Sequence, residues 1–267
     1  MLGSVAEAAD VVQDALMRMT SLEDVPGEPA AWMTTVATRL SIDHLRLARV
    51  RRESYVGPWL PEPLMIDATP GPGERMELAD SVSQAFLVVL EQLTPLERAA
   101  FLLREVFDYD YARVATVIDR SEANCRQLVT RAKKHLRASR PRLDTDRDHG
   151  QALLKQFLVA AEDGDLASLE AMLAEDVVLY GDGGGKVQAA AEPVAGARAV
   201  ARFVAAITRE RRRLGDFELE LATVNGQPGR VLRDSRRAVW DVLSIDVFEG
   251  RIQAIRVARN PDKLGHL

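Results

Sequence analysis

Two stretches rich in arginine and lysine are the part of this sequence best suited to bind a polyanion. Residues 120–142 carry eight basic side chains against Glu122 alone, a local net charge of +7. Residues 39–52 carry five against Asp43, a local net charge of +4. The whole chain has a net charge of −5, so the two clusters stand out against a mildly acidic background. Localised basic segments of this kind indicate two separate contacts with a polyanion such as nucleic acid.

The loop at residues 182–186, DGGGK, raises the question of phosphate binding. A Walker-type loop needs Ser or Thr after its lysine and a helix that starts there. Val187 follows the lysine instead, and no helix start is evident. The glycines fit a tight turn between strands, because glycine permits positive φ and close backbone approach. Such a turn requires neither the third glycine nor the lysine, so we expect its tip to contact the N-terminal part of the same chain.

Catalysis and metal binding have weaker support. The C-terminal half offers candidate polar side chains for a pocket, but no spacing among them marks a catalytic dyad: Asp176, Tyr180, Asp182, Trp240, Asp241 and Asp246. We therefore expect no enzyme, no cofactor and no metal site. A pocket that senses a small ligand without chemistry remains an alternative for this half.

Cysteine usage and hydropathy bear on the compartment. Cys125 is the only cysteine, so no disulfide can form within the chain, which suits a reducing cytoplasm. No apolar run has the length of a membrane span, and no signal peptide opens the sequence. These features predict a cytoplasmic protein with no membrane partner.

The elements around the larger basic cluster follow a helix-turn-helix pattern. A helix start at Thr94, with Pro95 and Glu97, is followed by a short helix from Tyr111 to about Ile118 and then by the turn DRS. A second helix begins with Ser121 as its N-cap. The side chains of this helix that can reach base edges or phosphates are Ser121, Glu122, Asn124, Arg126, Gln127, Arg131, Lys133 and Lys134. Taken alone, the helix could equally be a solvated basic surface.

Two helices precede this motif, at residues 5–18 and at about 30–52. We assign Val12 and Leu16 to the apolar side of the first helix. Trp32 on the second could stack on a flipped base or belong to the core. Residues 56–73 contain five prolines and therefore form a linker, in which we expect Trp59 to be buried.

From about residue 144 the sequence pattern changes from helices to a mixture of helices and strands. A helical stretch at about 149–172 and another at 196–214 accompany four β-like runs, VVLY, FELELATV, RAVWDVLSIDVFEG and RIQAIRVA. This order predicts an α+β domain with helices packed on a curved sheet.

Residues 1–140 resemble an extracytoplasmic-function (ECF) sigma factor of the sigma-70 family. EAADVVQDALMR is similar to the region 2.2 helix, AWMTTVATRLSIDHLRLARVRRE to the −10-reading segment, and residues 90–137 to region 4. The tail resembles the SnoaL-like branch of the NTF2-like fold. GPWLPEP, DGGGK and NPDKL are together typical of the sigma subgroup with a fused SnoaL-like domain.

The resemblance implies a multidomain fold. Region 2 would span residues 1–55 without its first helix, the Pro-rich linker 56–73, region 4 with its helix-turn-helix 74–141, and an α+β NTF2-like cone with a curved mixed sheet and three helices 149–267. The implied partners are core RNA polymerase, through its clamp, and the −10 and −35 promoter elements. The tail would regulate the factor in cis without a separate anti-sigma protein, and a small ligand could bind in it.

The resemblance also assigns roles to residues. Those of region 2 that would contact DNA are Trp32, Arg39, Asp43, Arg46, Arg49, Arg51 and Arg52. Those that would face the polymerase are Asp10, Gln13 and Asp14. Those that would form a regulatory contact between domains are Trp59, Leu60, Pro61, Asp182, Gly183, Gly184, Gly185, Lys186, Asn260, Pro261, Asp262 and Lys263. A function of a different class, an NTF2-like enzyme or small-molecule sensor fused to a helix-turn-helix module, remains the alternative.

Overall fold

The computed structural model describes residues 1–24, 26–53, 55–65, 87–88, 90–139 and 147–267, with the side chains of residues 49–53, 137–139 and 147 left out. The chain divides into two compact units. The N-terminal unit comprises Met1–Ser54 and Phe86–Arg140, and the C-terminal unit comprises Tyr55–Ala85 and Pro141–Leu267. Residues 55–65, at the start of the predicted linker, therefore belong to the C-terminal unit.

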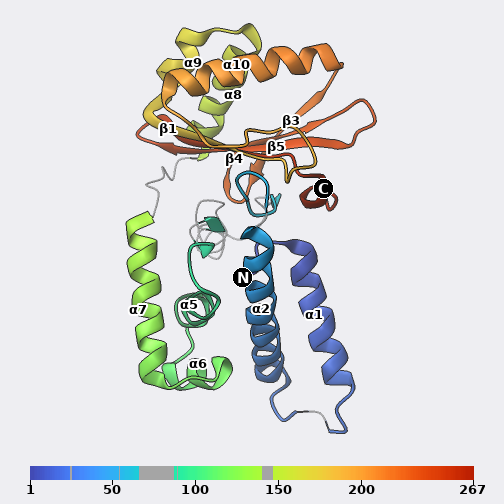
Figure 1. The fold of residues 1–267 in the computed structure, drawn as a ribbon, viewed down its shortest axis with the longest axis vertical. Coiled ribbons are helices and arrows are strands. Elements are labelled where there is room, and N and C mark those ends of the chain that lie inside the picture. Colours follow the sequence, from blue (N-terminus) through green and yellow to red (C-terminus); the bar gives the residue numbers. More distant parts are fainter. Residues whose placement is uncertain (25, 54, 66–86, 89, 140–146) are drawn as a thin grey trace. The chain divides into compact units, whose positions relative to one another are not determined.

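The N-terminal unit begins with two long helices that lie side by side (Figure 1). Helix α1 (Val5–Thr20) starts at Ser4, whose hydroxyl accepts a hydrogen bond from the Glu7 amide. Helix α2 (Pro29–Glu53) packs against it. Their shared core consists of Leu2, Val11, Ala15, Leu40 and Leu45.

The predicted apolar face of α1 needs a correction. Val12 and Leu16 are 50% and 45% exposed, and only Val11 and Ala15 of this helix are buried. The buried stripe is narrow because α1 has α2 as its only packing partner among the described elements with substantial contact. An exposed apolar strip is therefore left on the other side of the helix.

The predicted helix-turn-helix is present. The capping box of Thr94 and Glu97 opens α5 (Pro95–Phe101), which continues into a π-helical turn, η1 (Leu102–Val106). Helix α6 (Tyr111–Ile118) ends at Asp119, whose left-handed backbone (φ 54°) turns the chain into α7 (Glu122–Ser139). The helical periodicity of the sequence also predicts a helix at about 74–92, and most of that segment lies outside the described residues.

One residue of α2 enters the core of the helix-turn-helix. Ile42 is 5% exposed and belongs to the same cluster as Leu103, Val114 and Val129. Leu40 and Leu45 on the same helix face α1 instead. Helix α2 therefore has two apolar faces, one for each of its neighbours.

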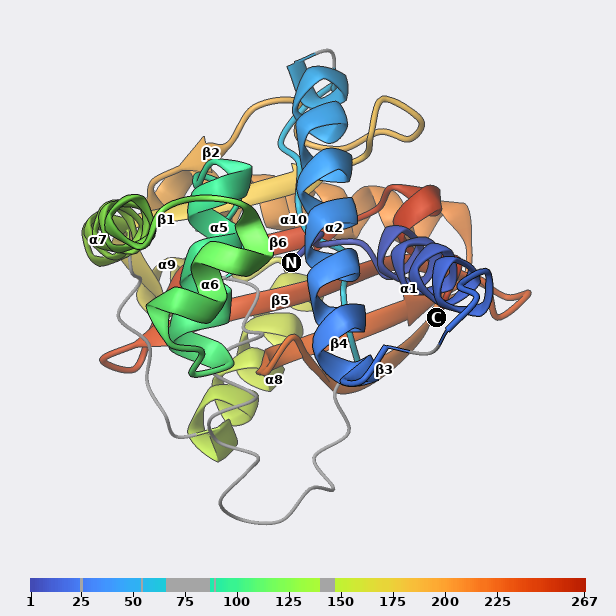
Figure 2. The ribbon, with the colours of Figure 1, turned by 90° about the horizontal axis from the view of Figure 1, so that it is seen from below.

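The C-terminal unit is an open, mixed six-stranded sheet with three helices on one face (Figure 1). The helices are α8 (Arg147–Asp163), α9 (Leu166–Met172) and α10 (Ala197–Leu214). The strands are β1 (Leu173–Asp182), β2 (Val194–Ala195), β3 (Glu218–Val224), β4 (Gln227–Arg233), β5 (Val239–Phe248) and β6 (Arg251–Ala258). Figure 2 shows the central strands lying beside one another; the full order is β2-β1-β6-β5-β4-β3, and only β1 and β6 run parallel. The predicted fold class is thereby confirmed.

Strand β4 is absent from the sequence prediction because Pro228 and Gly229 weaken its β-signal. The turn before β4 is a recognisable hairpin turn, because Asn225 and Gly226 both have positive φ, at 48° and 76°. Asn-Gly is the preferred pair for a two-residue hairpin. Among the described residues, no helix is long and apolar enough to cross a membrane.

Candidate nucleic-acid interface and linker-docking site

Helix α7 presents its polar side outward because its apolar residues are used by the core. Cys125, Val129 and Ala132 are buried at helical spacing. Ser121 caps the helix by accepting from the Asn124 amide, at 3.3 Å. The side chains expected to contact DNA are exposed, except for the partly buried Asn124 and Lys133: Ser121, Glu122, Asn124, Arg126, Gln127, Arg131, Lys133 and Lys134.

Two of these cations already have partners. Arg126 pairs with Glu122 at 2.8 Å and lies over the Tyr111 ring, 4.9 Å from its centroid. Lys133 pairs with Glu105 of η1 at 2.7 Å. Both pairs are partly exposed, so water screens them and a phosphate or base edge can displace either carboxylate at little cost. The pairs fix the orientation of the cations without blocking their use.

In α2, the structure gives the Arg39 guanidinium a position that the sequence did not suggest. Its Nε donates to the Val117 carbonyl at 2.9 Å and Nη2 to the Thr116 carbonyl at 3.0 Å. These carbonyls lie at the C-terminus of α6, where the helix dipole favours a cation. Arg39 thus joins α2 to the helix-turn-helix, and it would have to release these carbonyls in order to contact DNA.

The other predicted region 2 residues lie along α2 or beyond the described side chains. Arg46 pairs with Asp43 at 2.9 Å, with both side chains exposed. Trp32 is half-buried, which leaves both of its interpretations open. Arg49, Arg51 and Arg52 lie outside the described side chains.

The residues of α1 expected to face the polymerase lie at the surface. Asp10 and Gln13 are exposed and Asp14 is partly buried. Beside them, Val12 and Met17 are exposed to 50% and 52%. The apolar strip was missed because the sequence pattern placed it in the core, and it gives this surface a hydrophobic component that the acidic residues alone lack.

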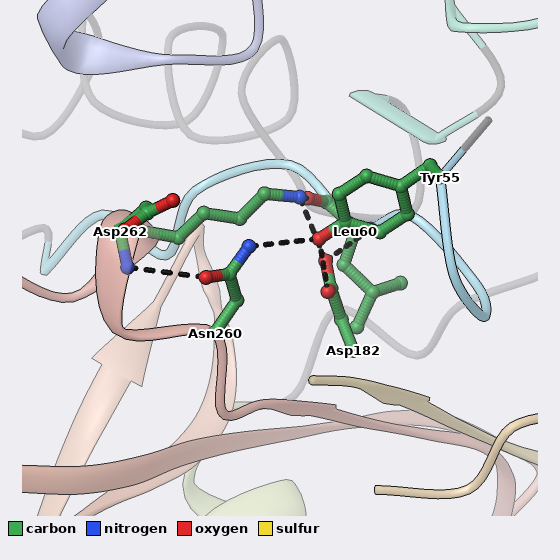
Figure 3. A network of polar contacts seen from close by, with 6 residues as sticks. Tyr55, Leu60, Asp182, Asn260 and Asp262 are labelled. Carbon is green, nitrogen blue, oxygen red and sulfur yellow. Dashed lines mark hydrogen bonds and ion pairs between the residues drawn. The ribbon is translucent and has the colours of Figure 1, made fainter. Parts of the chain in front are cut away.

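In the C-terminal unit, the start of the linker is bound to the sheet domain by a buried polar network (Figure 3). Asp182, at the end of β1, is fully buried. Its Oδ1 accepts from the Tyr55 hydroxyl at 2.5 Å, and its Oδ2 accepts from the Leu60 amide at 2.8 Å and from Lys263 Nζ at 2.7 Å. A carboxylate that receives three donors in a dry site fixes all of them.

Lys263 completes this network from the other side. Its Nζ also donates to the Leu60 carbonyl at 2.5 Å and lies over the Trp59 ring, 4.0 Å from the centroid. Cation–π contacts strengthen when the cation is desolvated, and the Lys263 side chain is 8% exposed. Trp59 itself is half-buried, less than the sequence suggested, whereas Leu60 and Pro61 are buried.

Tyr55 is a member of the network that sequence reasoning missed. Its hydroxyl donates to Asp182 and accepts from Asn260 Nδ2 at 2.9 Å. Burial, followed by the hydrogen bond to Asp182, raises the pKa of the Tyr55 phenol above its ordinary value. The phenol therefore remains a donor at neutral pH. A tyrosine in a loop carries no sequence signal of such a role.

The turn at residues 182–186 fits around this network. Gly184 and Gly185 have φ of 60° and 71°, and a Cβ on Gly184 would collide with the Asn260 side chain. A Cβ on Gly185 would lie 3.1 Å from Val56, and one on Gly183 would collide with the Val187 carbonyl. A side chain on any of the three glycines would therefore crowd a neighbour. For Gly184 this neighbour is Asn260, and for Gly185 it is Val56 of the linker.

The partner of Lys186 corrects a sequence-based expectation. The tip of the DGGGK loop was expected to contact the N-terminal part of the chain, whereas its lysine, Lys186, pairs with Asp262 of its own domain at 2.5 Å, with both side chains exposed. Asn260 and Pro261 shape the turn that presents Lys263: the Asn260 Oδ1 accepts from the Asp262 amide, and Pro261 opens the 3-10 helix η2 (Pro261–Lys263).

The next part of the linker extends along the sheet domain. The Leu64 amide donates to Asn225 Oδ1, and the Asn225 amide donates to the Leu64 carbonyl, both at 2.8 Å. His266 Nε2 lies 2.9 Å from the Pro63 carbonyl, and Met65 forms a β-bridge with the last residue of β3. Residues 55–65 are consequently part of this domain's structure.

Three of the six residues considered for a pocket are carboxylates that pair with basic side chains: Asp182, Asp241 and Asp246. Asp241 pairs with Arg230, and Asp246 pairs with Arg256 at 2.6 Å, both within the sheet. Asp182 binds the linker. Within the described part of the chain, no group of three His, Cys, Asp or Glu side chains could hold a metal.

Comparison with known proteins agrees with this organisation. The family model "Sigma-70 region 2" matches residues 1–51 and "Sigma-70, region 4" matches residues 83–136. The ECF RNA polymerase sigma factor SigJ of Mycobacterium tuberculosis is 38% identical over 272 residues, which cover 98% of this chain and 86% of SigJ. The probable ECF RNA polymerase sigma factor SigI of the same organism is 31% identical over 100% of this chain and 89% of its own length.

A solved structure gives the same result. The crystal structure of M. tuberculosis SigJ superposes with a TM-score of 0.76 at 33% identity, covering 98% of this chain and 91% of that one. Regions 2 and 4, the helix-turn-helix and the domain after them therefore occur together in a relative along its length. The chain belongs to the ECF RNA polymerase sigma factors, which direct promoter-specific initiation of transcription.

Proposed function

We propose that α7 reads the −35 element, that α2 and the loop before it read the −10 element, and that the C-terminal unit regulates the factor in cis through the linker. Core RNA polymerase would be held through its clamp by the exposed side of α1. The bound linker carries the regulatory part of this proposal, because the segment that follows region 2 is built into the other unit.

The contact between regions 2 and 4 is the contact that regulation would open or close. Arg39 binds the end of α6, and Ile42 lies in the region 4 core. The −10 and −35 elements are about 25 base pairs apart, which is about 85 Å at about 3.4 Å per pair. Two regions in contact cannot reach both elements at once. The described arrangement is therefore a closed state that must open on a promoter.

Binding of the linker to the sheet domain would favour this closed state by shortening the tether that connects regions 2 and 4. Regions 2 and 4 are tethered to each other by the residues between α2 and α5. Fixing residues 55–65 on the sheet domain removes these residues from the length over which the tether can extend. A shorter tether raises the effective concentration of one region near the other. The C-terminal unit would thus hold the factor closed without a separate anti-sigma protein.

Regulation fits the C-terminal unit better than catalysis does. Asp182, Asp241 and Asp246 are each neutralised by a basic partner, whereas a general acid or base needs a carboxyl whose proton is free to move. A small ligand could still act by shifting the binding of the linker. Because its partners would be RNA polymerase and promoter DNA, the factor would act in the cytoplasm.

The regulatory proposal is tested by run-off transcription with core polymerase. The double variant Asp182→Asn/Lys263→Gln removes both buried charges and should release the linker and raise promoter-dependent transcription. The double variant Lys186→Gln/Asp262→Asn removes an exposed pair from the same two loops and should leave transcription unchanged. Equal transcription by both variants, with both domains folded, would reject regulation through the linker.

Base reading by α7 needs its own test. Arg126→Ala should lose discrimination at one −35 base pair by about 1–3 kcal/mol. Lys134→Ala should weaken binding to all sequences and flatten the salt dependence by about one unit. Binding of both variants to cognate and scrambled −35 duplexes separates the roles, and identical effects of the two changes would sink the assignment to Arg126.

A further inference from the structure

Helix α10 has a charge that the proposed function leaves unexplained. Its 18 residues contain six arginines and one acidic residue, Glu210, a net charge of +5. The remainder of residues 149–267 has a net charge of −6. The helix is therefore a basic surface on an otherwise acidic domain.

The arginines fall into two groups. Arg211 and Arg212 both pair with Glu162 of α8, so they have a structural partner. The other four are Arg198, Arg202, Arg209 and Arg213, all of them exposed. Within the described part of the chain, none of these four makes a hydrogen bond, an ion pair or a ring contact.

The four unpaired arginines form one stripe. They follow one another at intervals of four, seven and four residues, which return to the same side of an α-helix. Val200, Ala201 and Val204 are buried on the side that packs in the domain core. The helix layer covers one face of the sheet (Figure 1), and the stripe points away from the core of that layer.

The dimensions and surroundings of the stripe suit a phosphate backbone. Fifteen residues of helix span about 22 Å, close to six base pairs of duplex. Ala199 and Ala206 are exposed beside it, and their side chains are too small to keep a flat partner away. Exposed arginines that repel one another gain most from a polyanion, and guanidinium groups match phosphate oxygens in pairs.

We propose that α10 is a DNA-contact surface of the C-terminal domain, whose arginine stripe binds the phosphates of duplex DNA without reading sequence. A sigma factor at a promoter is surrounded by duplex, which supplies this partner at high local concentration. The surface belongs to a different unit from α7 and α2, and it acts whether or not the linker is released.

Salt dependence of DNA binding tests the proposal in the full-length protein. Binding to a fluorescent duplex of mixed sequence is measured by anisotropy over a range of NaCl concentrations. Each phosphate neutralised contributes about −0.9 to the slope of log K against log salt. Arg202→Gln/Arg209→Gln should flatten the slope by about 1.8 units, and changing all four arginines to glutamine by about 3.6 units.

A charge-matched control separates the stripe from net charge. Arg236→Gln/Arg237→Gln removes two exposed arginines from the turn between β4 and β5 of the same domain and should leave the slope unchanged. An equal slope change in the control, or no change in the stripe variants, would overturn the proposal. Weaker binding of the stripe variants to core polymerase with an unchanged DNA slope would also overturn it, by showing a protein partner.

Discussion

Two intramolecular contacts of this chain differ in how far water reaches the charged groups that form them. Residues 55–65 are bound to the sheet domain through Asp182 and Lys263, both nearly inaccessible to water. Region 2 is bound to region 4 through Ile42 and Met1, which pack on the region 4 core, through the Met1 carbonyl, which accepts from Arg98, and through Arg39, which is exposed. Breaking the first contact would strand buried charges, whereas breaking the second leaves Arg98 paired with Glu91 and returns the Arg39 guanidinium to water.

The difference indicates which contact opens during function. A regulated step has to be reversible at a few kcal/mol, because a ligand or partner shifts an equilibrium only by its differential affinity for the two states. The contact between α2 and α6 meets that condition. The linker network is better suited to be a lasting anchor, whose release is a rarer event with a larger consequence. The predictions below test this ranking, from the largest effect to the smallest.

The largest effect should come from Asp182→Ala. Lys263 would remain buried without its carboxylate, and removing one partner of a buried pair typically costs about 3–5 kcal/mol. Urea unfolding of the full-length protein and hydrogen exchange of residues 55–65 measure the loss. Restored stability in Asp182→Ala/Lys263→Met would show that the stranded charge is the cause. A loss below about 1 kcal/mol would mean that water reaches the network and that the anchor is weak.

A smaller effect should follow from Gly184→Ala. The residue has φ of 60°, and its new Cβ would also displace the Asn260 side chain that binds Tyr55. Gly164→Ala is the matched control, because its φ is 70° and nothing lies within 4 Å of the added Cβ. Both changes should cost about 1–2 kcal/mol for the left-handed backbone. Only Gly184→Ala should also speed hydrogen exchange in residues 55–65, and equal exchange in the two variants would make the glycine an ordinary turn residue.

Arg39→Ala should have an effect of about 1 kcal/mol on the closed state, since it removes two hydrogen bonds at a half-exposed helix end. That shift changes the ratio of open to closed molecules about fivefold. Promoter-dependent transcription should rise. The comparison is Arg46→Ala on the same helix, a predicted DNA contact whose partner Asp43 is exposed, and this change should lower transcription. Transcription that falls with Arg39→Ala as it does with Arg46→Ala would show that Arg39 contacts DNA and does not hold the closed state.

The sequence predicted the elements better than the contacts between them. Helix α7 and its cap could be predicted because capping and helical spacing are local. The three motifs of the linker and tail lie together in the structure, around Asp182 and Lys263. The partners of Tyr55, Asn225 and His266 could not be predicted, because each depends on a segment far away in the chain. The role of Arg39 was assigned from the resemblance and the position of Val12 from helical spacing, whereas long-range packing determines where both side chains lie.

The smallest effect should come from Lys186→Glu, although this lysine is the charged residue of the DGGGK motif. It pairs with Asp262, and the two side chains are 52% and 61% exposed. Exposed pairs contribute about 0–1 kcal/mol, and salt screens them further. Stability should therefore change by less than about 1 kcal/mol and converge with that of the unaltered protein at high NaCl.

The matched comparison is Lys263→Glu, which makes the same charge reversal inside the buried network. There the new carboxylate would face Asp182 with little water to screen the two charges, so the anchor should unfold. Urea unfolding at low and high NaCl measures both variants. If Lys186→Glu proved as damaging as Lys263→Glu, exposure would not decide the strength of these contacts. The conclusion that the linker network is stronger than the contact between α2 and α6 would then fail.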